Sequence, residues 1–283
     1  MIIDRMSTKV HRVNSDDGTC LYVLEGGNPD GMPILFIHGY SQNHLCFFKQ
    51  FNSELLSRFR LIAFDLRGHG YSETPDEDSC KSAISWASDL KAVVDALGLE
   101  KVVAVAWSYG GLVLCDYIAT YGEDRLAAIN LVGANTEIGD SLMPYLSAPF
   151  LAVMPALLSN DVTRSSSGVK ELIALLTASA LPDELFYLLL GYNMAVSPKV
   201  RAAMVMRSVN HDATLANLSV PVLVSHGEDD NVVLKPLADH HLSLLQNGSA
   251  SFYPGAGHSP FMEAEQRFDA DLAELVTSVN PEV

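Results

Sequence analysis

The fold is decided by the stretch Ala106-Trp107-Ser108-Tyr109-Gly110. An apolar run at 102–105 precedes it, as expected for a buried strand, and an apolar run at 111–119 follows it, as expected for a buried helix. A serine on a sharp strand-to-helix turn has its hydroxyl pushed out at the edge of the sheet, where a base and a substrate can reach it. Small residues two positions before and after the serine permit the close backbone packing that this turn requires. Ala106 stands where glycine is commoner, so the backbones have less room to pack at this position.

The alternation of strands and helices continues on both sides of this turn. Short apolar runs predict strands at 34–37, 61–64, 126–132, 220–224 and 250–253. Helical spacing of apolar residues predicts helices at 85–97 and at about 264–279. The runs 10–13 and 21–24 flank an Asn-Ser-Asp-Asp-Gly turn and predict a hairpin. This order implies a mostly parallel sheet with helices on both faces.

The alternation of predicted strands and helices ends near Gly133. Residues 134–217 are rich in Leu, Ala and Met, contain five prolines, and predict several short helices and no strands. We therefore expect a core domain of residues 1–133 and 218–283, with a helical cap of residues 134–217 inserted after the sixth strand. The expected place of this cap is over the carboxyl edge of the sheet. The alternative is a helical extension with a purely structural role.

Composition excludes several classes of function. The 283 residues are 48% hydrophobic and 18% charged, which is ample for a large core. The net charge of −16 argues against nucleic acid and an anionic membrane surface as partners, and a small-molecule substrate is expected. The four cysteines show no C-x-x-C spacing, so neither a disulfide framework nor a metal site is predicted, and no cofactor is implied.

No secretory signal is evident at Met1–Arg5, and no run reaches the ~20 apolar residues of a membrane span. A cytoplasmic protein is therefore expected. Assembly into a homo-oligomer is left open by the sequence.

A nucleophilic serine needs a base and an orienting acid. His258 lies in a glycine-flanked loop directly after the last predicted strand, which can bring its imidazole back over the sheet edge. An isolated histidine is more often a core residue, but this position favours the base. The acid is expected after the strand at 220–224, where Glu228, Asp229 and Asp230 all remain candidates.

Oxyanion donors are expected from two backbone N–H groups. The N–H of Tyr109 opens the helix after the serine and has no intrahelical acceptor. The N–H of Tyr40 can supply the second donor, because Tyr40 lies in the His38-Gly39-Tyr40-Ser41 loop directly after the strand at 34–37. We expect His38 to brace this loop by hydrogen bonding rather than to act in catalysis. The residues expected to line the substrate pocket are Trp107, His38, Phe150 and Met154, with Trp107 either a pocket wall or simply core.

The chain resembles the α/β-hydrolase fold superfamily. The resemblance rests on five motifs in the family order: His38-Gly39, Phe64 to Ser72, Ala106 to Gly111, Gly227 to Asp230, and Gly255 to Ser259. It implies a Ser108–His258–Asp230 triad, because the family's acid lies three residues after the strand-end glycine; Asp229 is the fallback. Residues 197–201 and 212–221 look like the branch that holds cofactor-free haloperoxidases, aryl esterases and lactone hydrolases. Only the expected cap carries no strong family signal.

The resemblance also narrows the chemistry. Haloalkane dehalogenases and epoxide hydrolases of this fold use an aspartate at the position of Ser108, so the serine points to a serine hydrolase. The expected reaction is cleavage of an ester or lactone of a neutral, moderately hydrophobic small molecule through an acyl-enzyme. The alternatives with the same triad are a cofactor-free haloperoxidase or perhydrolase and a carbon–carbon bond hydrolase or lyase. An alternative of another class is a hydrolase-like receptor with little turnover.

Overall fold

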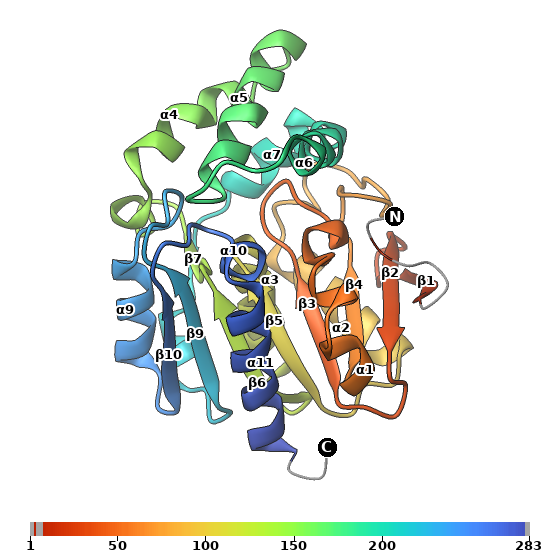
Figure 1. The fold of residues 1–283 in the computed structure, drawn as a ribbon. Helices are drawn as coiled ribbons and strands as arrows, with labels where there is room; N and C mark the ends of the chain where they lie inside the picture. The colour runs from red at the N-terminus through yellow and green to blue at the C-terminus, as the bar shows by residue number, and fades with distance from the viewer. Residues whose placement is uncertain (1–2, 4–7, 281–283) are drawn as a thin grey trace.

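The computed structural model describes residue 3 and residues 8–280. Most of the N-terminal segment in which no secretory signal was evident lies outside these residues. Within the described part, eight strands form one sheet in the order β1-β2-β4-β3-β5-β6-β9-β10 (Figure 1). The strands are β1 (Thr8–Asn14), β2 (Cys20–Gly27), β3 (Pro33–Ile37), β4 (Arg60–Phe64), β5 (Val102–Trp107), β6 (Leu126–Val132), β9 (Val222–Gly227) and β10 (Gly248–Tyr253).

The sheet is antiparallel at one edge and parallel elsewhere. β1 and β2 pair antiparallel as a hairpin, β2 pairs antiparallel with β4, and the six strands from β4 to β10 are parallel. This confirms the predicted hairpin and the mostly parallel sheet. β5 lies centrally and all six of its residues are buried, because helices cover both faces of the sheet.

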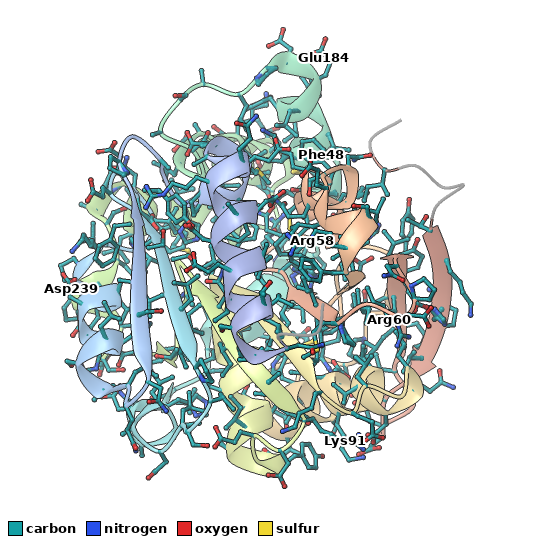
Figure 2. The ribbon with its side chains drawn as sticks, turned by 60° about the horizontal axis from the view of Figure 1, so that its bottom comes forward. Phe48, Arg58, Arg60, Lys91, Glu184 and Asp239 are labelled. Carbon is teal, nitrogen blue, oxygen red and sulfur yellow. The ribbon has the colours of Figure 1, made fainter. Side chains whose placement is uncertain are left out.

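Helices cover both faces of the sheet. On one face α2 (Ala83–Ala96) packs against α3 (Tyr109–Tyr121), which contacts α8 (Asp212–Ala216), and α8 contacts α9 (Pro236–Leu244). On the other face α11 (Glu265–Val279) packs against β6, and α1 (Leu55–Arg58) packs against β2 and β4 (Figure 1). The remaining short helices are η1 (His44–Phe47), η2 (Gln50–Asn52) and α10 (Pro260–Glu263). Charged side chains such as Asp239 and Glu184 project from the outside of this assembly (Figure 2).

Four helices stand over the carboxyl ends of the parallel strands (Figure 1). They are α4 (Ala148–Leu157), α5 (Val162–Leu175), α6 (Asp183–Ala195) and α7 (Pro198–Val205), and we call residues 148–205 the cap. A short helix, η3 (Met143–Tyr145), leads into it. The boundaries predicted at 134 and 217 stay a prediction, since α8 falls within them yet packs against α3 and α9.

The expectation of no strands between 134 and 217 is wrong. β7 (Glu137–Ile138) and β8 (Val209–Asn210) pair antiparallel where the chain leaves the core and returns to it. Two residues are too few to show the alternation by which a strand is recognised in a sequence.

Candidate active site

Ser108 occupies a strained turn between β5 and α3. Its backbone has φ 53° and ψ −121°, a region that residues other than glycine rarely adopt. Three hydrogen bonds hold the turn: the Ser108 N–H donates to the carbonyl of Val132 (3.0 Å), and the Ser108 carbonyl accepts from the N–H groups of Gly111 (2.9 Å) and Asn135 (3.0 Å). The strain is therefore offset by local bonds, and the side chain is held at the carboxyl end of the sheet.

The backbones around this turn pack as closely as the sequence motif predicts. A Cβ atom at Gly110 would lie 2.4 Å from the carbonyl oxygen of Ile37, and one at Gly39 would lie 2.9 Å from the Cβ of Ser108. Both positions therefore require glycine. Ala106 is fully buried between β3 and β6. Alanine is accommodated where the motif usually has glycine.

His258 and Asp230 form a buried hydrogen-bonded pair. The Nδ1 of His258 lies 2.7 Å from Oδ2 of Asp230, and the two residues are 1% and 6% exposed. The other oxygen of Asp230 accepts from the backbone N–H groups of Val232 (2.7 Å) and Val233 (2.9 Å). Asp229 is exposed. Of the three carboxylates that the local sequence leaves open, the structure thus brings Asp230 to the histidine.

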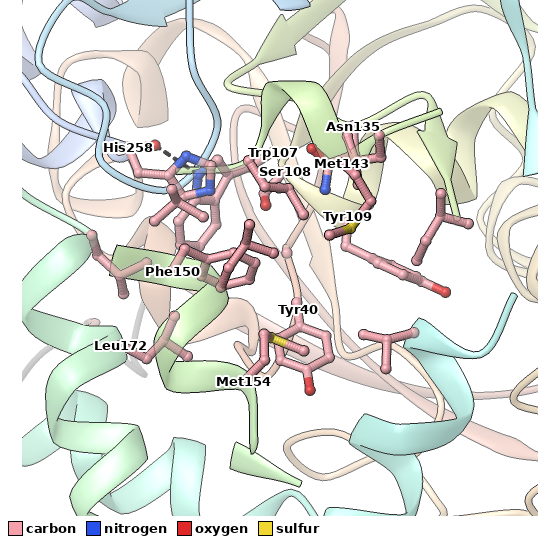
Figure 3. A pocket seen from close by; sticks show the side chains of 18 of the residues that line it. Tyr40, Trp107, Ser108, Tyr109, Asn135, Met143, Phe150, Met154, Leu172 and His258 are labelled. Atoms are coloured by element: carbon pink, nitrogen blue, oxygen red, sulfur yellow. Dashed lines mark hydrogen bonds between the residues drawn. The ribbon is translucent and has the colours of Figure 1, made fainter. Parts of the chain in front are cut away.

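Trp107 holds the loop that carries His258 in place. Its indole N–H donates to the carbonyl of His258 (2.9 Å), and the two rings lie 5.6 Å apart. Trp107 is fully buried and also lines the cavity at Ser108 (Figure 3). Trp107 is therefore part of the core and also part of the cavity wall, while its contact with a substrate stays a prediction.

The expected oxyanion donors lie beside the serine. Tyr109 is the first residue of α3, so its N–H has no acceptor within the helix. Tyr40 follows Gly39, whose Cα packs against Ser108, and both tyrosines line the cavity. Their phenol groups bond to α7 and its end: Tyr40 donates to the carbonyl of Arg201 (3.4 Å), and Tyr109 donates to that of Met204 (3.2 Å).

His38 does not line the cavity, and that expectation is wrong. Its Nδ1–H donates to the carbonyl of Gly39 (2.9 Å), and its Nε2 accepts from the N–H of Leu66 (2.9 Å). Burial lowers the pKa of His38 to about 4, so the ring is neutral, as an accepting Nε2 requires. These two hydrogen bonds support the Tyr40 loop, which is the role expected for His38 in place of catalysis.

Ser108 and His258 share one cavity of about 350 Å³ under the cap (Figure 3). Phe150 and Met154, which were expected in the substrate pocket, line this cavity from α4. The rest of its wall is largely aliphatic and comprises Ile138, Leu142, Met143, Leu146, Leu151, Leu172, Leu176, Val205 and Val232. Among the described residues that line it there is no Lys or Arg, and its acidic member, Asp140, is exposed.

Hydrogen bonds anchor the cap and its flanking segment to the catalytic loops. Ser147, directly before α4, donates its backbone N–H to the carbonyl of Val232 in the Asp230 loop (3.1 Å). Glu263, on α10, joins the cap to the His258 loop. Its carboxylate accepts from the N–H of Ser179, which lies between α5 and α6 (3.0 Å), and from the N–H of Gly257, which precedes His258 (2.6 Å). The cap therefore contacts the residues that hold the histidine and the acid.

Three further residues of this site were not singled out from the sequence. Gly133 has φ 47°, and a Cβ there would lie 3.1 Å from Nδ1 of His258 and 3.3 Å from Oδ2 of Asp230. Asn135 lines the cavity, and Arg201 is buried between the cap and the Tyr40 loop. The end of a strand at a glycine was the available signal for Gly133 and Asn135. Arg201 belongs to the stretch 197–201 that carries the branch resemblance, but nothing in that stretch indicates that its side chain reaches the site.

Within the described residues, no three or more His, Cys, Asp or Glu side chains are grouped so as to hold a metal ion. Nor does the described part of the chain contain a helix long and apolar enough to span a membrane.

Comparisons with known proteins agree with this architecture. Residues 34–270 match the model of the alpha/beta hydrolase family. A crystal structure of an esterase from Rhodococcus sp. ECU1013 superposes with a TM-score of 0.90 at 36% identity, covering 96% of this chain and 99% of that one. A putative aryl esterase from Burkholderia cenocepacia superposes with a TM-score of 0.90 at 31% identity, over the same shares of the two chains.

Among curated relatives, a non-heme chloroperoxidase of Streptomyces lividans is 28% identical over 94% of this chain and 99% of its own length. The family match covers well over half of the chain and includes Ser108, Asp230 and His258. The chain is therefore an enzyme that belongs to the alpha/beta hydrolase family.

Proposed function

We propose that this enzyme is a serine hydrolase that cleaves a carboxylic ester or lactone of a neutral, moderately hydrophobic small molecule. The observation that carries the proposal is the 2.7 Å hydrogen bond between His258 and Asp230 in the same site as the strained Ser108 turn. The similarity to two proteins described as esterases supports the ester class.

In the first half of the reaction, His258 removes the proton from Ser108 as its Oγ attacks the ester carbonyl. Asp230 holds the Nδ1–H of the imidazole and stabilises the imidazolium that forms. The N–H groups of Tyr40 and Tyr109 bind the oxyanion of the tetrahedral intermediate. The imidazolium then gives its proton to the departing alcohol, and the acyl group stays on Ser108.

In the second half, water attacks the acyl-enzyme while His258 takes a proton from it. Collapse of the second tetrahedral intermediate releases the carboxylic acid, and the proton returns to Ser108. Each half uses the same base, acid and oxyanion donors, so one pre-organised site serves both.

The lining of the cavity supports the substrate class. Its wall is mainly aliphatic, which favours burial of hydrocarbon, and no Lys or Arg from the described residues is there to bind an anion. The exposed carboxylate of Asp140 further disfavours a negatively charged substrate.

The test is hydrolysis of a series of p-nitrophenyl esters by the wild type and by Ser108→Ala, with labelling by a fluorophosphonate probe. We expect turnover of short to medium acyl chains and labelling by the wild type, and neither by the variant, which should retain the wild-type unfolding temperature. Activity of Ser108→Ala equal to that of the wild type would overturn the assignment.

A perhydrolase reaction is the second candidate, supported by the similarity to a non-heme chloroperoxidase. In that reaction hydrogen peroxide replaces water in the attack on the acyl-enzyme, so a peracid is released instead of the acid. Adding peroxide and acetate together with bromide and a halogenation dye measures it, because the released peracid oxidises bromide to the hypobromite that halogenates the dye. A peroxide-dependent rate that exceeds ester hydrolysis would favour this candidate.

A further inference from the structure

The side-chain amide of Asn135 lies in the cavity beside Ser108 and makes no hydrogen bond to a described residue. It lies three residues beyond β6, and its backbone N–H donates to the carbonyl of Ser108 (3.0 Å), which fixes its position relative to the serine. Its side-chain oxygen is buried without a hydrogen-bond partner. In Figure 3 the amide nitrogen points toward the interior of the cavity, on the side of Ser108. No described residue bonds to either amide atom.

Outside the Ser108–His258 pair, the other polar side chains of the cavity have protein partners or lie in solvent. Gln42 accepts from the hydroxyl of Tyr192 (2.8 Å) and donates to the side-chain oxygen of Asn193 (3.4 Å). The phenols of Tyr40 and Tyr109 bond to carbonyls of α7, while Asp140 is exposed.

The buried side-chain oxygen of Asn135 needs a donor, whereas the side-chain nitrogen, which faces the cavity, needs an acceptor and has none among the described residues. A substrate oxygen that accepts from this nitrogen gains a hydrogen bond, worth about 0.5–1.5 kcal/mol, and a substrate without an acceptor there does not. Sparse polar groups in an otherwise apolar pocket commonly orient the ligand in this way.

The position of Asn135 indicates which part of a substrate it meets. β5 carries Ser108 and lies between β3 and β6 in the sheet. The Tyr40 loop follows β3, whereas Asn135 follows β6, so the two flank the serine from opposite sides. With the reacting oxygen on the Tyr40 side, the amide of Asn135 faces a substituent of the acyl group.

We propose that Asn135 is a specificity-determining residue that donates a hydrogen bond to an acceptor oxygen on the carbon next to the reacting carbonyl. The preferred substrates are then esters or lactones of acids with an ether or hydroxyl oxygen on that carbon. This inference rests on the proposed ester hydrolysis, and it adds the substituent that the acyl group carries.

The test compares two esters of equal size, p-nitrophenyl methoxyacetate and p-nitrophenyl butanoate, which differ by an oxygen in place of a methylene. The measured quantity is the ratio of kcat/KM for the first ester to that for the second. Asn135→Leu keeps the approximate size of the side chain and removes the donor. We expect this ratio to fall about tenfold in Asn135→Leu, with little change for the butanoate.

Two controls keep the outcome specific to the amide. Met143→Leu alters another residue of the same wall without touching a polar group, and its ratio should equal that of the wild type. Asn135→Ala repeats the loss of the donor in case leucine disturbs folding. A ratio unchanged in both Asn135 variants, or an equal loss for both esters, overturns the proposal.

A binding experiment separates this inference from the proposed function. In the Ser108→Ala background, the affinities for the same two esters are measured through quenching of tryptophan fluorescence, with and without Asn135→Leu. Loss of the preference for the methoxyacetate supports the role of Asn135 even if the wild type hydrolyses neither ester, which would refute only the proposed function. An unchanged preference refutes the role of Asn135 whatever the wild type hydrolyses.

Discussion

The guanidinium of Arg201, on cap helix α7, lies 3.0 Å from the hydroxyl of Ser41 in the loop that carries Tyr40. Ser41 has a φ of 64°, so this loop holds a strained residue directly after the expected oxyanion donor. The same guanidinium donates to the carbonyls of Leu157 (3.1 Å) and Asn193 (2.5 Å). One buried cation thus joins helices α4, α6 and α7 to the oxyanion loop.

Replacing Arg201 with methionine should weaken both the fold and the reaction. The change leaves several buried acceptors without a donor, and each such acceptor typically costs about 1–3 kcal/mol. We expect the free energy of unfolding in urea to fall by about 3 kcal/mol or more, and kcat to fall at least about tenfold as the oxyanion loop loses its support.

The control for this variant is Arg164→Met, which removes an exposed arginine from the same cap. It should change the free energy of unfolding by no more than about 0.5 kcal/mol and leave kcat unaltered. Equal effects of the two substitutions would contradict a special role for the buried arginine.

Asp230 and Asp229 should differ sharply when each is changed to asparagine. Asp230→Asn keeps the size of the side chain but removes the charge that holds the Nδ1–H of His258, so kcat should fall by about 10³–10⁴-fold. Asp229 is exposed, and Asp229→Asn should stay within about twofold of the wild type. Steady-state hydrolysis of one p-nitrophenyl ester by both variants decides the matter, and a comparable loss in Asp229→Asn would contradict the assignment.

Local patterns in the sequence predicted the parts of the site that depend on neighbouring residues. The turn at Ser108 requires a strand before it and a helix after it, and both are recognisable from apolar periodicity. The adjacent carboxylates at 228–230 share the same local context, so the local pattern left all three open. The family resemblance implied Asp230, which is the buried one, whereas Asp229 is exposed. The direction of the His38 side chain at the end of β3 was likewise not contained in the pattern.

Residues that act between distant segments were beyond such patterns. Arg201 meets Ser41 across 160 positions of the chain, and its neighbours in the sequence give no sign of that contact. Asn135 has its role because β6 pairs with β5 and brings it to Ser108. These relationships follow from the packing of the cap and the sheet, which one sequence does not specify residue by residue.

Gly133→Ala should damage catalysis beyond its effect on stability. The added Cβ would press on Nδ1 of His258 at 3.1 Å and on Oδ2 of Asp230 at 3.3 Å. A positive φ costs a residue other than glycine about 1–2 kcal/mol in addition. We expect kcat to fall at least about tenfold as the histidine and the acid are pushed from their alignment.

Gly98→Ala provides the matched control. Gly98 also has a positive φ, of 63°, but a Cβ there meets nothing within 4 Å. The two variants should therefore lose similar stability in thermal unfolding, and only Gly133→Ala should lose kcat. If Gly98→Ala reduced kcat as much, backbone strain alone would account for the effect.

Buried histidines beneath the Tyr40 loop should make the fold sensitive to acid. Burial lowers the pKa of His38 to about 4 and that of His69 to about 3, against an ordinary value near 6.5. As the pH falls below 6.5, the unfolded chain takes up these protons and the folded chain does not. Stability is therefore complete above pH 6.5 and is lost progressively toward pH 4, by up to about 1.4 kcal/mol per pH unit for each proton.

The variant His69→Asn isolates one of these protons. Its shorter amide can still donate to the carbonyl of Arg67, which the Nδ1–H of His69 contacts at 2.9 Å, but it does not titrate. Urea unfolding at pH 7.5, 6.0 and 5.0 should show a shallower loss of stability in the variant, by up to about 1.4 kcal/mol per pH unit below pH 6.5. The comparison uses slopes, so any constant cost of the substitution cancels. Parallel slopes in the two proteins would mean that His69 takes up its proton equally in the folded and unfolded chains.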